Sequence, residues 1–418
     1  MPVIESTRAA TRWTTRIIPF VLAAAVGVAT YAVVVRVCSS YLIDTHRRYG
    51  AAIVILVLYL LFFLLMVTTY ARTIAVANTD PGLVPLGPLA VERNSRERKR
   101  TKTGAQQDLE SQAYYAGPDL NPDSPGLEQF YAREVFVCDS DGRPKWCSTC
   151  CNWKADRVHH SSELGRCVYR MDHYCPWVGG MIGENSFKFF TQFTTYTACY
   201  CAVVLGATAF TLRKKIEEGS GLDPWVLAAL VLAAFFGLFT FLMTVTSLRY
   251  IILNMTNVDM LGAHSKVYQL AVQVPRGTRS SDKFIVVTYP LPKPGQETNG
   301  YSSRTPTLEG AYGKTNGSRP TTRDDLATRT FAILKTEPGE NPWHLSTWKN
   351  WQTIMGSNPL DWLLPIRKSP CVNHETQESF YPMGNALKDV RVRYGLPRDP
   401  VDHSNGFELK DLPSSNRT

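Results

Sequence analysis

GAAIVILVLYLLFFLLMVTTYA, residues Gly50–Ala71, decides the fold class because it contains no Asp, Glu, Lys or Arg. A bilayer core about 30 Å thick is crossed by roughly 20 helical residues at about 1.5 Å per residue. Lipid offers no hydrogen bonds to exposed backbone groups, so a segment of this length must span as a helix. We therefore predict a transmembrane helix here.

Three further runs share this composition. They are Ile17–Val35, Phe189–Leu212 and Pro224–Leu248. Arg8, Arg12 and Arg16 precede the first run like the basic region of a signal peptide, but the run exceeds the usual apolar core of about 7 to 15 residues. The sequence thus predicts an all-α membrane protein with four transmembrane helices, in which helices 1 and 2 lie within residues 1–72 and helices 3 and 4 within 189–248.

The orientation follows from basic residues near the ends of the runs, since cytosolic loops are richer in Lys and Arg. This rule places the N-terminus, the segment 73–188 and the tail 249–418 in the cytosol. The connection between the first two runs opposes it, because this loop contains Arg36, Arg47 and Arg48 against a single Asp44. Four spans place the N-terminus, the central segment and the tail on the same side, and the central segment is basic. We give these two observations more weight than the exception.

The net charge of +9 does not indicate nucleic-acid binding, because the basic residues are scattered along the chain. Attraction to anionic lipid head groups already accounts for a cytosolic excess of positive charge. We therefore expect the lipid bilayer, and no nucleic acid, among the partners.

The polar segments differ in composition. We interpret 73–137 as a cytosolic linker, with little fixed structure from Val91 to Asp123, and 138–188 as a compact cysteine-rich module. Residues 276–330 are predicted to be flexible. Four tryptophans within 341–365 indicate an element at the membrane interface. The remainder to Thr418 is predicted to be loosely ordered.

Cys147 and Cys150 form a C-x-x-C pair, and His160 and Cys167 follow at distances that suit a tetrahedral zinc site. Thiols in the cytosol usually stay reduced, which favours metal binding over disulfides. Four protein ligands leave no position for a substrate, so this zinc would be structural. Cys151 and His159 flank the ligands and are alternative ligands, whereas we expect Cys138 to bind no metal.

A second constellation is Asp172, His173 and Cys175. A thiol is nucleophilic as its thiolate, an imidazole can take its proton, and a carboxylate can fix the ring tautomer. These residues are therefore the candidate catalytic set. On residue types alone, Cys175 is equally well explained as a further metal ligand or a buried thiol.

The segments CSTCCNWKADRVHHSSELGRC (147–167) and MDHYCPWVGGMIGENSFKFF (171–190) resemble the cysteine-rich domain of the DHHC palmitoyltransferase family. Three other stretches agree with this resemblance. Asp80-Pro81-Gly82 matches its DPG motif, Thr256–Asp259 resembles its TTxE motif with two substitutions, and residues 341–356 resemble its C-terminal element, with His344 where an acidic residue is common.

The resemblance implies a ping-pong mechanism. Cys175 would take the acyl group from fatty acyl-CoA, and a cysteine of a membrane-associated protein substrate, exposed to the cytosol, would then take it from Cys175. His173 would serve as the base and Asp172 would orient it. A cavity between the spans would hold the acyl chain.

One departure from the family concerns its second zinc ion, whose ligands map onto Ser161, Leu164, Tyr174 and Met181. None of these is Cys or His, so we predict one structural zinc per chain. Leu164, Tyr174 and Met181 would instead form a small apolar cluster. The DHYC motif with these losses is similar to a fungal subgroup, the protein fatty acyltransferase number five type.

Two rival functions are weighed against the enzyme. A membrane ubiquitin ligase with a RING-like module needs eight ligands for two metals, which this spacing does not offer. A catalytically silent zinc-binding scaffold is the stronger alternative, because one family metal site is missing. Labelling by a fatty acyl-CoA that depends on Cys175 discriminates between the scaffold and the enzyme.

Overall fold

The computed structural model describes residues 2–103, 126–289, 329–374 and 376–398. The chain forms two compact units, each assembled from three separate stretches. The first comprises Met1–Leu86, Arg157–Ala263 and His344–His374, and the second comprises Gly87–Asp156, His264–Trp343 and Glu375–Thr418.

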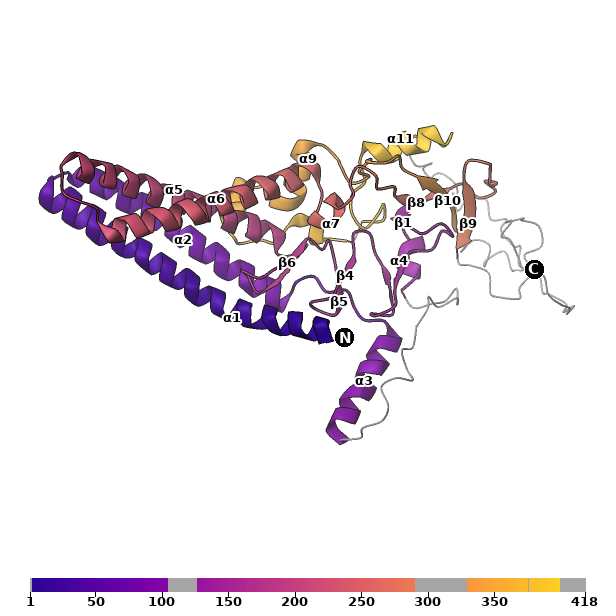
Figure 1. Ribbon diagram of the computed structural model, residues 1–418. Coiled ribbons are helices and arrows are strands. Elements are labelled where there is room, and N and C mark those ends of the chain that lie inside the picture. The colour runs from indigo at the N-terminus through magenta and orange to yellow at the C-terminus, as the bar shows by residue number, and fades with distance from the viewer. Residues whose placement is uncertain (1, 104–125, 290–328, 375, 399–418) are drawn as a thin grey trace, which may run out of the picture. The chain divides into compact units, whose positions relative to one another are not determined.

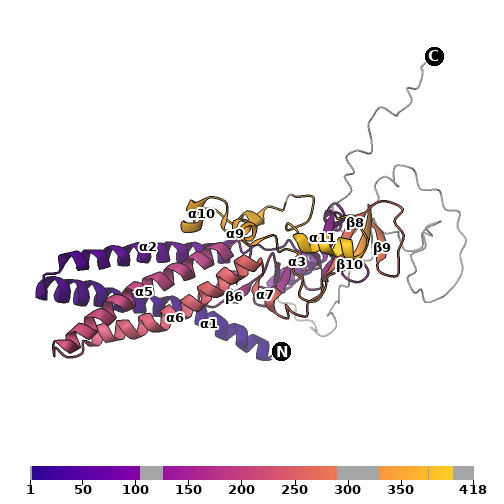
Figure 2. The same ribbon diagram turned by 90° about the horizontal axis from the view of Figure 1, so that it is seen from above.

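The first unit contains the four predicted spans as long helices that run side by side (Figures 1 and 2). They are α1 (Pro2–Thr30) with its π-helical continuation η1 (Tyr31–Thr45), α2 (Tyr49–Thr79), α5 (Phe187–Glu217) and α6 (Pro224–Leu253). Each has a stretch long and apolar enough to cross a bilayer. The prediction of four transmembrane helices is confirmed, and the chain is an integral membrane protein.

Three hydroxyl groups link the first three spans inside this bundle. Tyr59 Oη lies 2.6 Å from Thr30 Oγ1 and 3.0 Å from Tyr200 Oη. Tyr59 is buried, and an unpaired hydroxyl in an apolar interior is costly. The mutual hydrogen bonds therefore fix the rotation of these helices relative to one another.

Asp223 caps the N-terminus of α6 and offsets the basic residue that opposed the predicted orientation. Its side chain accepts hydrogen bonds from the backbone N–H groups of Trp225 and Val226. Arg36 Nη2 lies 2.7 Å and Lys215 Nζ 3.1 Å from Asp223 Oδ2. The charge of Arg36, which is partly exposed, is thus paired with a carboxylate at the start of α6.

Two short hairpins lie between the second and third spans in the first unit. The first joins β4 (His159–Ser161) to β5 (Arg166–Val168), and the second joins β6 (His173–Cys175) to β7 (Gly180–Ile182). Both are antiparallel. These hairpins present most of the predicted site residues.

The second unit contains an antiparallel sheet in the order β1-β8-β10-β9 and a hairpin of β2 (Lys145–Cys147) with β3 (Asn152–Lys154). The sheet strands are β1 (Val135–Val137), β8 (Gln269–Val274), β9 (Ile285–Tyr289) and β10 (Arg329–Lys335). Phe136, Tyr289 and Phe331 pack together in its core. The chain is mostly helical, as predicted, and hydropathy gave no indication of this sheet.

Three polar segments are more ordered than predicted. Helix α3 (Pro88–Thr103) occupies part of the supposed linker, where α4 (Glu128–Tyr131) also lies. Strand β9 and the start of β10 fall in the supposed flexible segment 276–330. Near the C-terminus, η2 (Pro370–Val372) and α11 (Asn385–Arg393) are regular. The same predictions for 104–123, 290–328 and 399–418 lie outside the described residues.

The predicted interfacial element contains α9 (Thr347–Met355) and α10 (Pro359–Leu363). Asn350 Nδ2 donates to the Ile252 carbonyl at 2.7 Å, which fastens α9 to the end of α6. Several apolar side chains of the element are exposed, namely Trp348, Leu360, Leu363 and Ile366. This exposure suits a surface that lies against lipid.

Candidate functional site

The four predicted zinc ligands come together. In the β2–β3 hairpin, Cys150 N donates to Cys147 Sγ at 3.5 Å. In the β4–β5 hairpin, His160 and Cys167 are directly opposite each other, with His160 Nδ1 3.9 Å from Cys167 Sγ. All four ligand atoms lie within 4.8 Å of one another. Among the described residues, this is the group of His, Cys and acidic side chains that can hold a metal ion.

The donor set fits zinc. A tetrahedral site with Zn–S bonds of about 2.3 Å places its ligand atoms roughly 3.8 Å apart, close to the separations observed. The alternative ligands are outside this group. Cys151 Sγ donates to the Ser148 carbonyl at 3.4 Å, and His159 pairs with Val168 at the neighbouring position of the ladder.

Strand β6 holds the predicted nucleophile and base. Residues i and i+2 of a strand share a face, so His173 and Cys175 project to the same side. Cys175 is buried. His173 Nδ1 lies 2.7 Å from Asp172 Oδ2, and its ring packs edge-on against Phe190 of α5. The three residues of the predicted catalytic set are therefore together.

The surroundings of His173 favour its charged form. Burial lowers the pKa of the imidazole, but hydrogen bonds to Asp172 and Cys175 outweigh burial and raise that pKa to about 9. An imidazole beside a thiol can take the thiol's proton as the thiol attacks, so the arrangement suits a cysteine nucleophile.

The second oxygen of Asp172 is fixed by α7 (Asn257–Met260), which lies within the TTxE-like segment. Asn257 N donates to Asp172 Oδ1 at 2.8 Å. Thr256 and Asp259 form a reciprocal capping box around the start of this helix. The carboxylate that orients His173 is thus held by backbone from a distant part of the sequence.

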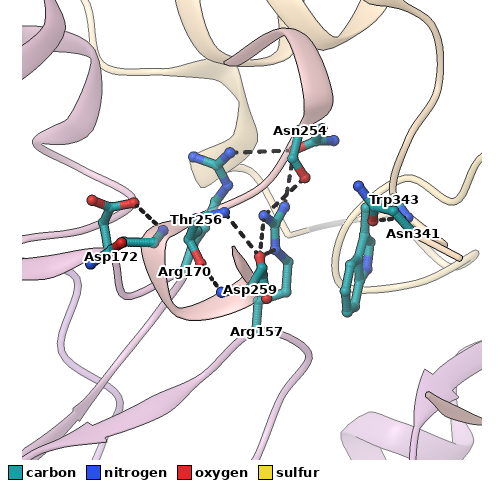
Figure 3. A network of polar contacts seen from close by, with 9 residues as sticks. Arg157, Arg170, Asp172, Asn254, Thr256, Asp259, Asn341 and Trp343 are labelled. Carbon is teal, nitrogen blue, oxygen red and sulfur yellow. Dashed lines mark hydrogen bonds and ion pairs between the residues drawn. The ribbon is translucent and has the colours of Figure 1, made fainter. Parts of the chain in front are cut away.

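A buried ion pair supports α7 in turn. Arg157 Nη2 lies 2.7 Å from Asp259 Oδ2, and Arg157 Nη1 donates to Asn254 Oδ1 at 3.0 Å (Figure 3). Arg170 Nη2 donates to the same Asn254 oxygen at 3.3 Å. Both arginines are buried and have positive φ, a conformation that non-glycine residues keep only where their surroundings enforce it.

The four positions that correspond to the family's second zinc site make contacts within the chain. Ser161 Oγ donates to Glu163 Oε2 at 2.9 Å and accepts from Leu164 N at 3.2 Å. Tyr174 and Met181 are directly opposite in the β6–β7 ladder, and Met181 is fully buried. Tyr174 and Met181 are thus cross-strand neighbours, and the predicted apolar cluster of Leu164, Tyr174 and Met181 stays a prediction.

Three residues near the site have no signature in the sequence: Arg157, Arg170 and Tyr70, whose hydroxyl donates to the Trp177 carbonyl beyond Cys175. The arginines lie between cysteines and histidines in a basic chain, and nothing in their sequence context separates them from surface charges. Tyr70 lies in an apolar run, where its hydroxyl group has no periodic signature. The Thr256–Asp259 motif was the available signal, and its contact with Asp172 follows from the fold alone.

Comparison with known proteins agrees with this geometry. The family model for DHHC palmitoyltransferases matches residues 140–263. The chain is 36% identical to the palmitoyltransferase pfa5 of Aspergillus fumigatus over 91% of its length and 90% of the relative. It is 36% identical to that of Emericella nidulans, over 91% and 86% of the two chains. The palmitoyltransferase PFA5 of Saccharomyces cerevisiae is 30% identical over 31% of this chain and 35% of its own.

Similarity of this extent covers the four spans, the hairpins and the tail together. The chain is therefore a member of the DHHC palmitoyltransferase family, of the pfa5 type, and a protein S-palmitoyltransferase.

Proposed function

We propose that the protein transfers a fatty acyl group from acyl-CoA to protein cysteines through an acyl-Cys175 intermediate. The observation that carries this proposal is the line of contacts from Asn257 N to Asp172, from Asp172 to His173, and from His173 to Cys175. Each contact holds the next group in place, so that His173 can take the proton of the buried Cys175 thiol as the thiol attacks.

In the first half-reaction, the Cys175 thiolate attacks the thioester carbonyl of acyl-CoA. The bond from the carbonyl to the CoA sulfur breaks, and the CoA thiolate leaves with a proton from the His173 imidazolium. Asp172 keeps the ring in the tautomer that holds its other nitrogen toward the sulfur. One thioester replaces another, so catalysis rests on placing the sulfur beside the carbonyl.

In the second half-reaction, a cysteine thiol of a membrane-associated protein gives its proton to His173 and attacks the acyl-Cys175 thioester. Cys175 leaves as the thiolate, which restores the starting pair. No outside oxidant or base is required.

The surroundings of the thiol suit a lipid donor. Trp177, two residues after Cys175, packs against Phe236 and Phe239 of α6. Burying each CH₂ group of an acyl chain contributes about 0.8 kcal/mol, so apolar space between the spans would bind a long chain firmly. We infer that the acyl chain lies between the spans, with the thioester at the level of Trp177.

We further propose that the N-terminus, the cysteine-rich module and the C-terminal tail face the cytosol. Pairing of Arg36 with Asp223 supports this orientation, because a paired charge weighs less than a free one in the opposing loop. Attachment of a membrane-impermeant maleimide to cysteines introduced at Thr7 and Ser220 tests it. Labelling of Ser220→Cys, and not Thr7→Cys, from the cytosolic face would overturn the orientation.

The four metal ligands would hold one structural zinc ion, which supplies rigidity to the hairpins and no chemistry to the acyl transfer. The residues of the acyl transfer are Asp172, His173 and Cys175 alone. Zinc would therefore contribute to the stability of the hairpins, and the nucleophile to the acyl transfer.

The decisive test uses purified protein and alkyne-tagged palmitoyl-CoA. We expect wild type to gain a hydroxylamine-sensitive label and Cys175→Ala to gain none. Cys371→Ala is the matched control, because Cys371 is equally buried and lies outside the catalytic set. Persistent labelling of Cys175→Ala would refute the assigned nucleophile, and an unlabelled wild type would favour a silent zinc-binding scaffold.

A further inference from the structure

Tyr70 of α2 contacts the turn that follows the nucleophile. Its hydroxyl donates to the Trp177 carbonyl at 2.8 Å. Its ring stacks on Phe193 of α5, with the ring centroids 4.8 Å apart. One phenol from the second span is thus held by the third span and bonded to the backbone two residues beyond Cys175.

The Trp177 carbonyl lies where the hairpin ladder gives no support. The β6–β7 ladder ends at the pair of Cys175 with Gly180, and Trp177 is in the turn between them. The Cys175 carbonyl accepts bonds from Val178 N and Gly179 N, which tightens the turn, and the Trp177 ring packs on Phe236 and Phe239 of α6. The bond from Tyr70 adds a fixed point on the backbone of the turn.

A second contact of α2, at Ala77, lies beside Gly180 at the end of the same turn. A Cβ on Gly180 would lie 3.0 Å from the Cβ and the carbonyl oxygen of Ala77, which is tighter than an ordinary contact, so the backbone approaches α2 more closely there than a side chain would normally permit. Tyr70 and Ala77 are two helical turns apart on one face of α2. The hairpin therefore rests against the second span at two points.

The two flanks of Cys175 are anchored by separate means. His173, on one flank, is held by Asp172 and by Phe190 of α5. Trp177, on the other flank, is held by Tyr70, which itself packs on Phe193 one turn after Phe190. The first anchor sets the proton chemistry of the thiol and the second sets its position.

We propose that Tyr70 is a positioning residue that holds the Cys175 sulfur in line with the thioester carbonyl, an inference that rests on the proposed function. Small displacements of a reacting atom slow a transfer strongly, by about 100-fold for about 1 Å in enzymes generally. A released turn keeps its fold and its acid–base pair, so we expect Tyr70→Phe to slow Cys175 acylation by about tenfold.

Single-turnover acylation at saturating palmitoyl-CoA separates position from folding. Tyr70→Phe should lower the rate constant and keep the amplitude, since each folded chain still accepts one acyl group. Tyr196→Phe is the matched control, because it removes a phenol bonded to a backbone carbonyl, that of Leu363, outside the catalytic set. The control should keep the wild-type rate constant.

Alkylation of Cys175 by iodoacetamide, followed on its peptide by mass spectrometry, gives a readout independent of acyl transfer. Releasing the turn should make the buried thiol react several-fold faster while the pH midpoint of the reaction stays that of wild type. If wild type takes no palmitoyl group but this contrast persists, the anchor stands and the enzymatic proposal fails.

Two results would overturn the inference. One is a wild-type acylation rate constant in Tyr70→Phe. The other is a reduced amplitude with an unchanged rate constant, which would show that Tyr70 affects only the folded fraction.

Discussion

The β4–β5 and β6–β7 hairpins have the same length and pairing but differ in their central pair. The first has His160 opposite Cys167, two of the proposed metal ligands. The second has Tyr174 opposite Met181. One hairpin thus contributes to the candidate metal site, and the other, which contains the proposed nucleophile, depends on apolar packing and hydrogen bonds from α2, α5 and α7. A metal site is one of several ways to stabilise a short hairpin.

The largest expected difference between the hairpins concerns the metal. Cys167→Ala removes a ligand, and structural zinc in small modules contributes about 10 to 16 kcal/mol. We expect loss of bound zinc, loss of protease resistance and loss of acylation together. Retention of one zinc ion by Cys167→Ala, measured by elemental analysis, would show that Cys151 or His159 replaces it.

The next largest effect tests the ion pair behind the nucleophile hairpin. Asp259→Ala leaves the buried Arg157 guanidinium without its carboxylate, which typically costs about 3 to 5 kcal/mol. We expect a large fall in thermal stability and in acylation. Replacing both partners by apolar residues, as in Arg157→Met with Asp259→Leu, should recover part of the stability, and no recovery would contradict the isolated-charge explanation.

Met181 tests the packing that stands in for the second zinc. Truncating a buried methionine to alanine costs about 2 to 5 kcal/mol, whereas a change of similar volume usually costs less than about 1.5 kcal/mol. Met181→Ala should therefore lower the unfolding temperature clearly, and Met181→Leu only slightly. Equal losses in the two variants would mean that the thioether, and not volume, matters.

The smallest effect concerns the proton. Asp172→Asn removes a contact that raises the pKa of His173, so the imidazolium is lost at lower pH and the thiolate pair weakens. We expect Cys175 alkylation at pH 7 to slow by about tenfold, as for a pKa change of about one unit. An alkylation rate at pH 7 unchanged by Asp172→Asn would contradict the role of the carboxylate.

The same pKa has a consequence for stability. A group whose pKa is raised by folding stabilises the native state fully below its ordinary pKa, about 6.5 for histidine. That stability is lost as pH rises from 6.5 through about 9. The thermal unfolding temperature of wild type should therefore fall more over this pH range than that of Asp172→Asn.

Hydropathy and residue spacing predicted the spans and the cluster of three cysteines and one histidine, because lipid length and tetrahedral coordination impose strict local patterns. They also predicted that Asp172, His173 and Cys175 act together, since these residues are adjacent. The support of Asp172 by Asn257 and of Trp177 by Tyr70 depends on contacts across 85 and 107 residues, and no local pattern encodes these. The sheet was not predicted because its strands come from segments that are far apart in sequence.

Native mass spectrometry of the detergent-purified protein after reaction with palmitoyl-CoA tests the account most directly, because one spectrum reports metal and acyl group on the same chain. We predict one zinc ion and one palmitoyl group per chain, with the acyl group on the peptide that contains Cys175. Two zinc ions per chain, or a palmitoyl group located on another cysteine, would contradict the account.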